Sequence, residues 1–396
     1  MKLNFGFSEE WKEYKKFEKL TDKERSIVFY AENEASMNHF RLLISELTEA
    51  RNLQICYVTS VKDDPMLTMK NKNILSFYIG KGRTIRTKFF IFLKAKILIM
   101  DMPDLGIYHI KRSKVFPVHY IYIFHSMFSI HSYLRKGALD NYDTIFCVGK
   151  HHEKEIRATE ERYGLKEKKL IRYGFGRLDT LLQEKQKFRN TYTEDKNLIL
   201  ITPTYGEKNL LQICGKELIE ILLKADFTVM LRPHYRIFKD SKKLINSMIE
   251  NFGNNPNFIL EKGIIPSDKF HSSKCLISDW SGISLEYAFT FEHPVILIDI
   301  PKKILNPDSG DISIEPIEVS IRDKIGHVIS PNNLEKIPEI IKNIKNDSSM
   351  NEQIRKICSE TVYNIGKSAK IGAEVIEKIY EESNKQDSQK QLMCFG

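Results

Sequence analysis

The sequence contains few of the features that mark membrane-spanning, disulfide-bonded or nucleic-acid-binding proteins. Its six cysteines are scattered without CxxC spacing, so we expect buried free thiols in a reducing compartment. The longest apolar runs are far below the ~18 residues that span a bilayer, and the charged N-terminus has no signal-peptide core. An RNA- or DNA-binding signature and solenoid repeats are also absent from the sequence. We therefore expect a cytoplasmic protein, soluble or surface-bound, without a nucleic-acid partner.

Length and charge narrow the class of protein further. A chain of 396 residues is longer than one typical domain and predicts two. The formal net charge of +9 favours an anionic partner, such as an acidic membrane or a phosphorylated substrate. Because the lysines and arginines are spread out, solvated helix faces explain most of them.

Hydrophobic periodicity predicts two α/β halves joined by a polar linker at 183–196. Two helical patterns follow at 333–344 and 349–380. We expect an N-terminal helix within 1–25, an α/β domain at 26–185, a second α/β domain at 186–332, C-terminal helices at 333–382 and a disordered tail at 383–396. Polar motifs at strand ends in both halves suggest an enzyme with a central cleft.

Two basic segments with aromatic residues are candidates for contact with an anionic bilayer. The first is the predicted helix at 8–20, where Trp11, Tyr14 and Phe17 stand among lysines. The second is the segment 80–96, where phenylalanines stand among lysines and arginines. Either aromatic set could instead pack on its own domain, and the sequence leaves both interpretations open.

The stretch at 275–289 is the strongest indication of a phosphate site. It reads as a buried strand, a Ser/Gly turn and the start of a helix. Such a helix start presents unpaired N–H groups and the positive end of the helix dipole, which can hold a phosphate. Ser281 and Ser284 would add hydroxyl donors, Gly282 would let the backbone approach closely, and Glu286 could accept from ribose hydroxyls. An ordinary helix start capped by Asp or Ser is the alternative.

Other predicted strands also end in polar residues, which is where open α/β sheets bind ligands. These residues are His125-Ser126-Met127, Thr202-Pro203-Thr204 and Arg232-Pro233-His234. Asp101 and Asp104 could be interpreted as metal ligands. We expect no metal, because hard cations need several oxygens and the chain has no DxD in a clear metal context.

These segments, in this order, resemble those of the CDP-glycerol glycerophosphotransferases, the polymerases and primases of teichoic-acid and related capsule synthesis. The similar segments lie within residues 115–300: Phe124-His125-Ser126-Met127, Gly174-Phe175-Gly176-Arg177-Leu178-Asp179, Thr202-Pro203-Thr204, Leu231-Arg232-Pro233-His234 and Ser278-Asp279-Trp280-Ser281-Gly282. The chain departs from the family pattern after His125, where Ser-Met-Phe replaces Gly-Thr-Pro. It also departs at Gly176 and Gly282, which replace Pro and Ser. The motifs expected to bind the donor therefore match the family pattern better than the motifs expected to bind the acceptor.

The resemblance implies a GT-B architecture, with two Rossmann-like domains and the nucleotide held mainly by the C-terminal one. It also implies an enzyme that is peripheral to the inner face of the plasma membrane and acts on a lipid-linked or glycan acceptor. The implied reaction is attack of an acceptor hydroxyl on the β-phosphorus of a CDP-activated polyol, glycerol or ribitol, with CMP leaving. No cofactor is required in this reaction, and the activated donor is a substrate.

Within this resemblance, His125 is the candidate base, and His131 is a weaker competitor because it falls inside a predicted helix. Arg232 could bind two phosphate oxygens, and His234 could stabilise charge on the leaving CMP. Asp279 caps the helix or orients the turn, and the cap is favoured.

The remaining donor contacts follow from the same resemblance. Ser281, Gly282 and Ser284 would cradle the diphosphate, and Glu286 would take the ribose. Thr202 and Thr204 either touch the donor or only form a β-turn.

Two other functions stay open. A glycosyltransferase of the same architecture could use a UDP- or CMP-sugar, since the turn ending at Glu286 fits such donors equally well. A non-catalytic, membrane-bound assembly factor would keep the fold without the chemistry, as the altered residues after His125 suggest. The expected partners are the nucleotide-activated donor, the acceptor and an anionic membrane surface.

Overall fold

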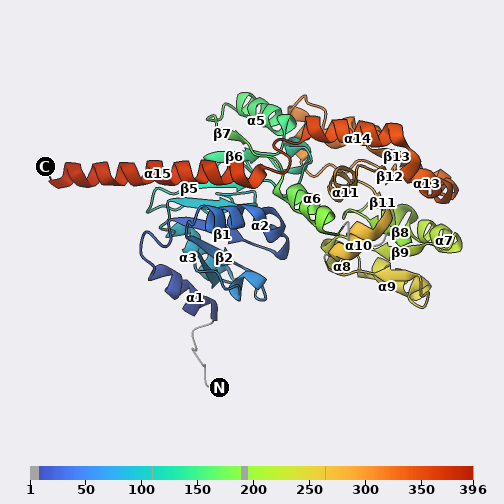
Figure 1. Ribbon diagram of the computed structural model, residues 1–396, viewed down its shortest axis with the longest axis horizontal. Coiled ribbons are helices and arrows are strands. Elements are labelled where there is room, and N and C mark those ends of the chain that lie inside the picture. Colours follow the sequence, from blue (N-terminus) through green and yellow to red (C-terminus); the bar gives the residue numbers. More distant parts are fainter. Residues whose placement is uncertain (1–8, 109, 189–194, 264, 396) are drawn as a thin grey trace, which may run out of the picture.

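Two parallel β-sheets, each with helices on both faces, lie side by side as two lobes in this computed structural model (Figure 1). The structure describes residues 9–108, 110–188, 195–263 and 265–395. The predicted α/β fold is therefore confirmed.

The first lobe is built on a seven-stranded sheet in the order β3-β2-β1-β4-β5-β6-β7. Its strands are β1 (Ile27–Ala31), β2 (Ile55–Thr59), β3 (Ile74–Tyr78), β4 (Ile97–Met100), β5 (His119–Ile123), β6 (Thr144–Cys147) and β7 (Lys169–Arg172). Its helices are α1 (Glu9–Glu18), α2 (Met37–Ser45), α3 (Arg83–Ile91), α4 (Ile130–Tyr133), α5 (Lys150–Tyr163) and α6 (Gly176–Phe188). Side chains alternate across a strand, so Val28 and Tyr30 of β1 face one core cluster while Ile27 and Phe29 face another.

The second lobe is built on a six-stranded sheet in the order β10-β9-β8-β11-β12-β13. Its strands are β8 (Asp195–Thr202), β9 (Thr228–Leu231), β10 (Phe258–Leu260), β11 (Ser273–Ser278), β12 (Val295–Ile298) and β13 (Gly326–Ile329). Its helices are α7 (Lys216–Lys224), α8 (Tyr235–Asp240), α9 (Lys242–Phe252), α10 (Ser267–Ser272), α11 (Ile283–Phe291), α12 (Ile317–Ser320) and α13 (Ile337–Asn343). Strand order reverses between β1 and β4 in the first sheet and between β8 and β11 in the second. Open α/β sheets bind ligands beside such reversals, at the carboxyl ends of the strands.

The last two helices tie the lobes together. Helix α14 (Ser348–Thr361) packs on α11 of the second lobe, and α15 (Ser368–Phe395) runs back along the first lobe (Figure 1). The crossing segment lies directly on the first lobe, because a Cβ at Gly174 would stand 2.3 Å from the carbonyl oxygen of Tyr363. Asp179 of α6 holds the start of α15, since its carboxylate accepts from the N–H groups of Gly366 and Ser368 at 2.6 and 3.0 Å.

Three expectations about chain segments are wrong. Residues 183–188, expected in a linker, end α6, while 189–194 lie outside the described residues. The pattern at 349–380 is two helices, because Asn364 and Gly366 adopt left-handed φ values of 47° and 76° that turn the chain. Residues 383–395, expected to be disordered, continue α15, and Lys96 anchors this part through Asn384 and Asp387. Residue 396 lies outside the described part of the chain.

The aromatic side chains of the two basic segments mostly pack inside the first lobe. Tyr14 and Phe17 are buried, and the Lys88 ammonium lies 4.6 Å from the centroid of the partly buried Trp11 ring. In the second segment Phe89 and Phe90 are buried, and Phe92 is 52% exposed. Of the two interpretations, packing of the aromatic rings on their own domain is therefore correct for most of them. Within the described residues, no helix is both long and apolar enough to cross a membrane.

Candidate active site between the two lobes

The carboxyl edges of the two sheets meet at Ser126 and Gly282. A Cβ added to Gly282 would lie 3.1 Å from the Ser126 hydroxyl oxygen. Ser126 follows β5 of the first lobe, and Gly282 stands at the start of α11 in the second. The structure therefore brings the His125 segment and the 275–289 stretch together where the two lobes meet.

His125 is held in a defined tautomer by the backbone. Its Nδ1 lies 3.0 Å from the carbonyl oxygen of Asp101, which follows β4. Because a carbonyl can only accept, Nδ1 carries the proton and Nε2 keeps a free lone pair. Burial lowers the pKa of His125 below its usual value, although the hydrogen bond to Asp101 opposes this. A neutral imidazole with an accepting Nε2 at pH 7 is the form that a general base needs.

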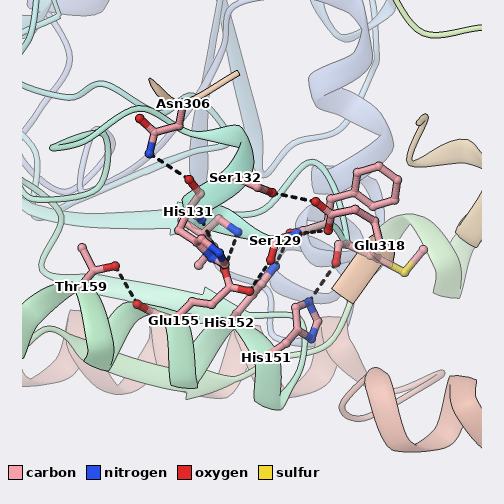
Figure 2. Close-up of polar contacts among 12 residues, drawn as sticks. Ser129, His131, Ser132, His151, His152, Glu155, Thr159, Asn306 and Glu318 are labelled. Atoms are coloured by element: carbon pink, nitrogen blue, oxygen red, sulfur yellow. Dashed lines mark hydrogen bonds and ion pairs between the residues drawn. The ribbon is translucent and has the colours of Figure 1, made fainter. Parts of the chain in front are cut away.

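The segment that follows His125 is clamped by α5 of its own lobe (Figure 2). His151 and His152 each bond a carbonyl oxygen of this segment through Nε2, those of Met127 and Phe128, both at 2.9 Å. The Glu155 carboxylate accepts from the Ile130 N–H at 2.5 Å and lies 3.1 Å from His131 Nδ1. Figure 2 shows His131 turned toward Glu155, so this histidine positions the segment.

Side chains of the second lobe also form hydrogen bonds with this segment. Glu318 of α12 accepts from the Ser129 N–H at 3.0 Å and from the Ser132 hydroxyl at 2.7 Å, and Asn306 donates to the His131 carbonyl at 2.8 Å (Figure 2). Glu318 is 8% exposed, so its carboxylate is committed to these bonds. The segment at 127–132 that follows His125 is therefore held by side chains from both lobes.

Asp279 does not cap α11, contrary to the favoured expectation. Its carboxylate reaches across to the loop after β8 and accepts from the N–H groups of Thr204 and Leu210 at 2.8 and 3.0 Å. Arg322 lies over the Trp280 ring, 4.0 Å from its centroid, and donates to the Asp279 carbonyl at 3.0 Å. These contacts hold the turn against the second lobe.

The turn before α11 is closed partly by its own side chain. Ser284 donates its hydroxyl proton to the Ser281 carbonyl at 2.7 Å, so this hydroxyl is not a free donor. The N–H groups of Leu285 and Glu286 bond the Gly282 carbonyl at 3.1 and 3.3 Å. The N–H groups of Ser281, Gly282 and Ile283 have no acceptor among the described residues. These three groups form the part of the turn that can still bind an anion.

Arg232 follows β9 directly and lies near enough to Glu286 to feel its charge. Its Nε donates to the Gly263 carbonyl at 3.0 Å, which directs the rest of the guanidinium. Burial lowers the pKa of Arg232, and the charges of Glu286 and Glu261 oppose this effect. Burial raises the pKa of Glu286, against the charges of Arg177 and Arg232. Arg177 of α6 stands 3.7 Å from Glu286, so this carboxylate also links the two lobes.

His234 begins α8 and lies between two tyrosine rings. The centroids of Tyr205 and Tyr235 are each 4.5 Å from its own. Its Nδ1 accepts from the Arg236 N–H at 3.3 Å, so in the neutral ring Nε2 carries the proton. Burial and the nearby charges of Lys303, Arg232 and Arg236 lower the pKa of His234 to about 3. His234 therefore presents an N–H donor where His125 presents an acceptor.

Thr202 and Thr204 are both buried. The Thr202 carbonyl accepts from the Ser278 hydroxyl at 2.6 Å, which ties β8 to β11. Thr204 donates its N–H to Asp279 and accepts from the Lys303 ammonium at 2.9 Å. Through these two hydrogen bonds, Thr204 holds the loop after β8 in place.

The two aspartates considered as metal ligands have protein partners instead. Asp101 accepts from the Ser36 hydroxyl at 3.0 Å, and burial raises its pKa to about 7. Asp104 pairs with Arg135 at 2.7 Å. Among the residues that the structure describes, no group of three or more potential ligands could hold a metal ion.

The sequence did not single out several residues of this site. They are Tyr205, Lys303, Glu318 and Arg322. Only one signal pointed to Lys303: a Pro-Lys-Lys run just after the apolar strand β12, where site residues are expected. The role of Glu318 rests on contacts across 189 residues of chain, which no local pattern shows.

A sequence profile of the CDP-Glycerol:Poly(glycerophosphate) glycerophosphotransferase family matches residues 14–301. This chain belongs to that family. The matched region contains the His125 segment, Arg232, His234 and the turn before α11, and the family's activity is that of a transferase acting on a CDP-activated donor. No curated protein gives a significant match to the chain.

Solved structures share the architecture at low sequence identity. The wall teichoic acid polymerase TagF, in a crystal soaked with CDPG, is 16% identical with a TM-score of 0.59, and the match covers 95% of this chain and 94% of that one. The UDP-GlcNAc 2-epimerase from Neisseria meningitidis, bound to UDP-GlcNAc, is 15% identical with a TM-score of 0.56, covering 89% and 100%. A UDP-N-acetylglucosamine 2-epimerase from Rickettsia bellii is 12% identical with a TM-score of 0.54, covering 90% and 96%. At these identities the likeness establishes the shared two-domain GT-B fold.

Proposed function

We propose that this glycerophosphotransferase moves glycerol phosphate from CDP-glycerol to a hydroxyl of a lipid-linked or glycan acceptor and releases CMP. The observation that carries the proposal is the approach of Gly282 to Ser126, with 3.1 Å between the Gly282 Cβ position and the serine oxygen. A donor held at the turn before α11 would thereby lie against the His125 segment.

The two histidines have complementary roles in the proposed reaction. The acceptor hydroxyl gives its proton to Nε2 of His125, and its oxygen forms a new bond to the β-phosphorus. The bond from this phosphorus to the bridging oxygen breaks, and the electron pair stays on CMP. Arg232 and the Nε2–H of His234 stabilise this developing charge. His125 then returns the proton to solvent.

The donor's diphosphate would lie on the free N–H groups of Ser281, Gly282 and Ile283, with Ser281 also offering a hydroxyl. Glu286 would accept from the ribose hydroxyls. The Ser284 hydroxyl and the Asp279 carboxylate would shape this turn through their bonds to Ser281 and to the loop after β8.

The direct test is CMP release from CDP-glycerol in the presence of a glycan or lipid-linked acceptor. We expect turnover by the wild type and loss of about 10²- to 10⁴-fold in His125→Asn, the usual contribution of a general base. His119→Asn is a matched control, because His119 starts the same strand at its opposite end, where it bonds Thr144 at 2.8 Å. Absence of CMP release by the wild type, or full turnover by His125→Asn, would contradict the proposal.

A nucleotide panel tests the donor. Thermal stabilisation grows as RT ln(1 + [L]/Kd), so the preferred donor gives the largest shift. We expect CDP-glycerol to stabilise the protein more than CDP-ribitol, UDP-sugars or CMP-sugars.

The outer face of α1 is the part of the surface that we propose meets an anionic membrane. Tyr14 and Phe17 point inward, which leaves Lys12 and Lys16 of α1 exposed, together with Lys19 just after the helix. Each lysine near an anionic surface contributes about 1 kcal/mol. Flotation with phosphatidylserine or cardiolipin liposomes should therefore carry the wild type upward and fail for a Lys12→Glu, Lys16→Glu, Lys19→Glu variant. Equal flotation of both proteins would contradict this surface.

A further inference from the structure

Lys303 stands where the two lobes meet, on the loop after β12. Its ammonium donates to the Thr204 hydroxyl at 2.9 Å and lies 3.1 Å from the centroid of the Tyr205 ring. The Tyr133 ring, from α4 of the first lobe, has its centroid 6.0 Å from the same nitrogen. Tyr133 also lines the small cavity that contains His125 and Ser126. The Lys303 amine is therefore held at the interlobe cleft by neutral groups.

The charged groups around Lys303 do not supply it with a counter-ion. Asp279, at the end of β11, is the attractive charge nearby, but both its oxygens accept backbone N–H groups. Arg236 of α8 repels the ammonium, and burial together with the charge of Lys303 lowers the pKa of His234 in the same segment. No carboxylate in the described part of the chain lies within 4.0 Å of the Lys303 nitrogen. Burial lowers the pKa of Lys303 to about 7, with Asp279 opposing this shift.

We propose that Lys303 is a further cation for the donor diphosphate, in addition to Arg232 and His234, and that its amine takes up a proton when the donor binds. This inference rests on the proposed function, because it assigns one more residue to that donor site. Lys303 lies beyond residue 301, where the match to the family profile ends. A buried amine without a counter-ion and close to the donor turn is the arrangement that a doubly negative diphosphate completes.

The sign of the proton uptake follows from the surroundings of Lys303. Burial lowers the pKa of its amine to about 7, with the charge of Asp279 opposing this shift, so part of the amine population is neutral near neutral pH. A bound diphosphate favours the charged amine and raises its pKa, so binding takes up protons. The uptake grows as pH rises, because more of the amine then starts neutral. Donor affinity should therefore fall as pH rises above 7.

The experiment is calorimetric titration of the full-length protein with CDP-glycerol, in buffers of different ionisation enthalpy, from pH 6.5 to 8.5. For the wild type we expect proton uptake and a Kd that rises up to tenfold per pH unit above 7. Lys303→Met should weaken binding about ten- to hundredfold at pH 6.5 and abolish proton uptake, because a charge-assisted hydrogen bond is lost. Lys303→Arg should keep the low-pH affinity and lose the pH dependence, because a guanidinium stays charged throughout this range.

Lys302→Met is the matched control, because Lys302 is the adjacent residue and is exposed to solvent. It should bind CDP-glycerol as the wild type does. Wild-type affinity and proton uptake in Lys303→Met would overturn the assignment of Lys303 while leaving CMP release, and so the proposed function, intact. Should Lys303→Met fold poorly in a thermal melt, an unchanged pH dependence in Lys303→Arg would overturn the assignment as well. A wild type that neither binds CDP-glycerol nor releases CMP would overturn both proposals.

Discussion

Replacing Gly282 with alanine probes the point at which the lobes meet. The new methyl carbon would start 3.1 Å from the Ser126 hydroxyl oxygen, a few tenths of an ångström closer than an ordinary contact. The backbone of Gly282 is helical, with φ −57°, so alanine brings no conformational strain of its own. The whole effect should therefore come from crowding across the cleft.

Crowding of this size costs about 1 kcal/mol, near the low end for an added methyl group in a packed site. If the transition state loses this free energy, kcat/KM falls about fivefold. Ser126→Ala removes the oxygen that the methyl meets, so the double variant should recover most of this loss. Ser126→Ala alone gives up the bond from the Phe128 N–H at 3.2 Å, and a small loss is expected there.

The assay is CMP release from CDP-glycerol by the wild type, both single variants and the double variant, with thermal melts as the control for folding. A coupling free energy near 1 kcal/mol between the two positions would support direct contact. Strictly additive effects, or full activity of Gly282→Ala, would refute the interlobe approach on which the proposed site depends.

Three further predictions concern the residues around this contact. Since burial lowers the pKa of His125, the acid limb of kcat/KM should lie below the ordinary histidine value of about 6.5, and a limb above pH 7 that shifts in His125→Asn would contradict this. Asp279→Asn turns an amide donor toward a backbone N–H group, and it should lower stability by about 1–3 kcal/mol in urea denaturation; an unchanged midpoint would show that the carboxylate bonds are dispensable. Glu318→Gln removes one of the two hydrogen bonds that Glu318 accepts from the segment after His125. We therefore expect kcat to fall several-fold while KM for CDP-glycerol changes little. A selective rise in KM would contradict the role of Glu318 in positioning this segment.

Local sequence was sufficient for most strands and for the residues that follow them. The apolar run at 295–298 is bounded by Pro294 and a polar loop, and the structure places β12 at these residues. The same holds for β3 at 74–78 and β10 at 258–260. The short length of these apolar runs and the turn residues that flank them favour a buried strand over a helix.

The role of Asp279 could not be predicted from the local sequence. A cap and a cross-loop anchor look the same in the sequence, because both place a carboxylate before a helix. Its two partners, Thr204 and Leu210, are 75 and 69 residues away in the chain. The polar composition of 383–395 likewise suggested disorder, whereas contacts with Lys96 of the first lobe hold α15 there.

The amino-acid sequence by itself determined the alternation of strands and helices, the polar residues at strand ends and the family to which the chain belongs. Periodicity and turn chemistry act over a few residues, which is why they can be interpreted without a fold. Only the tertiary structure decided which residues face one another: His125 with its free Nε2, Gly282 against Ser126, and Lys303 among neutral groups. These relations depend on how two sheets dock, and docking is set by packing between segments that are distant in the chain.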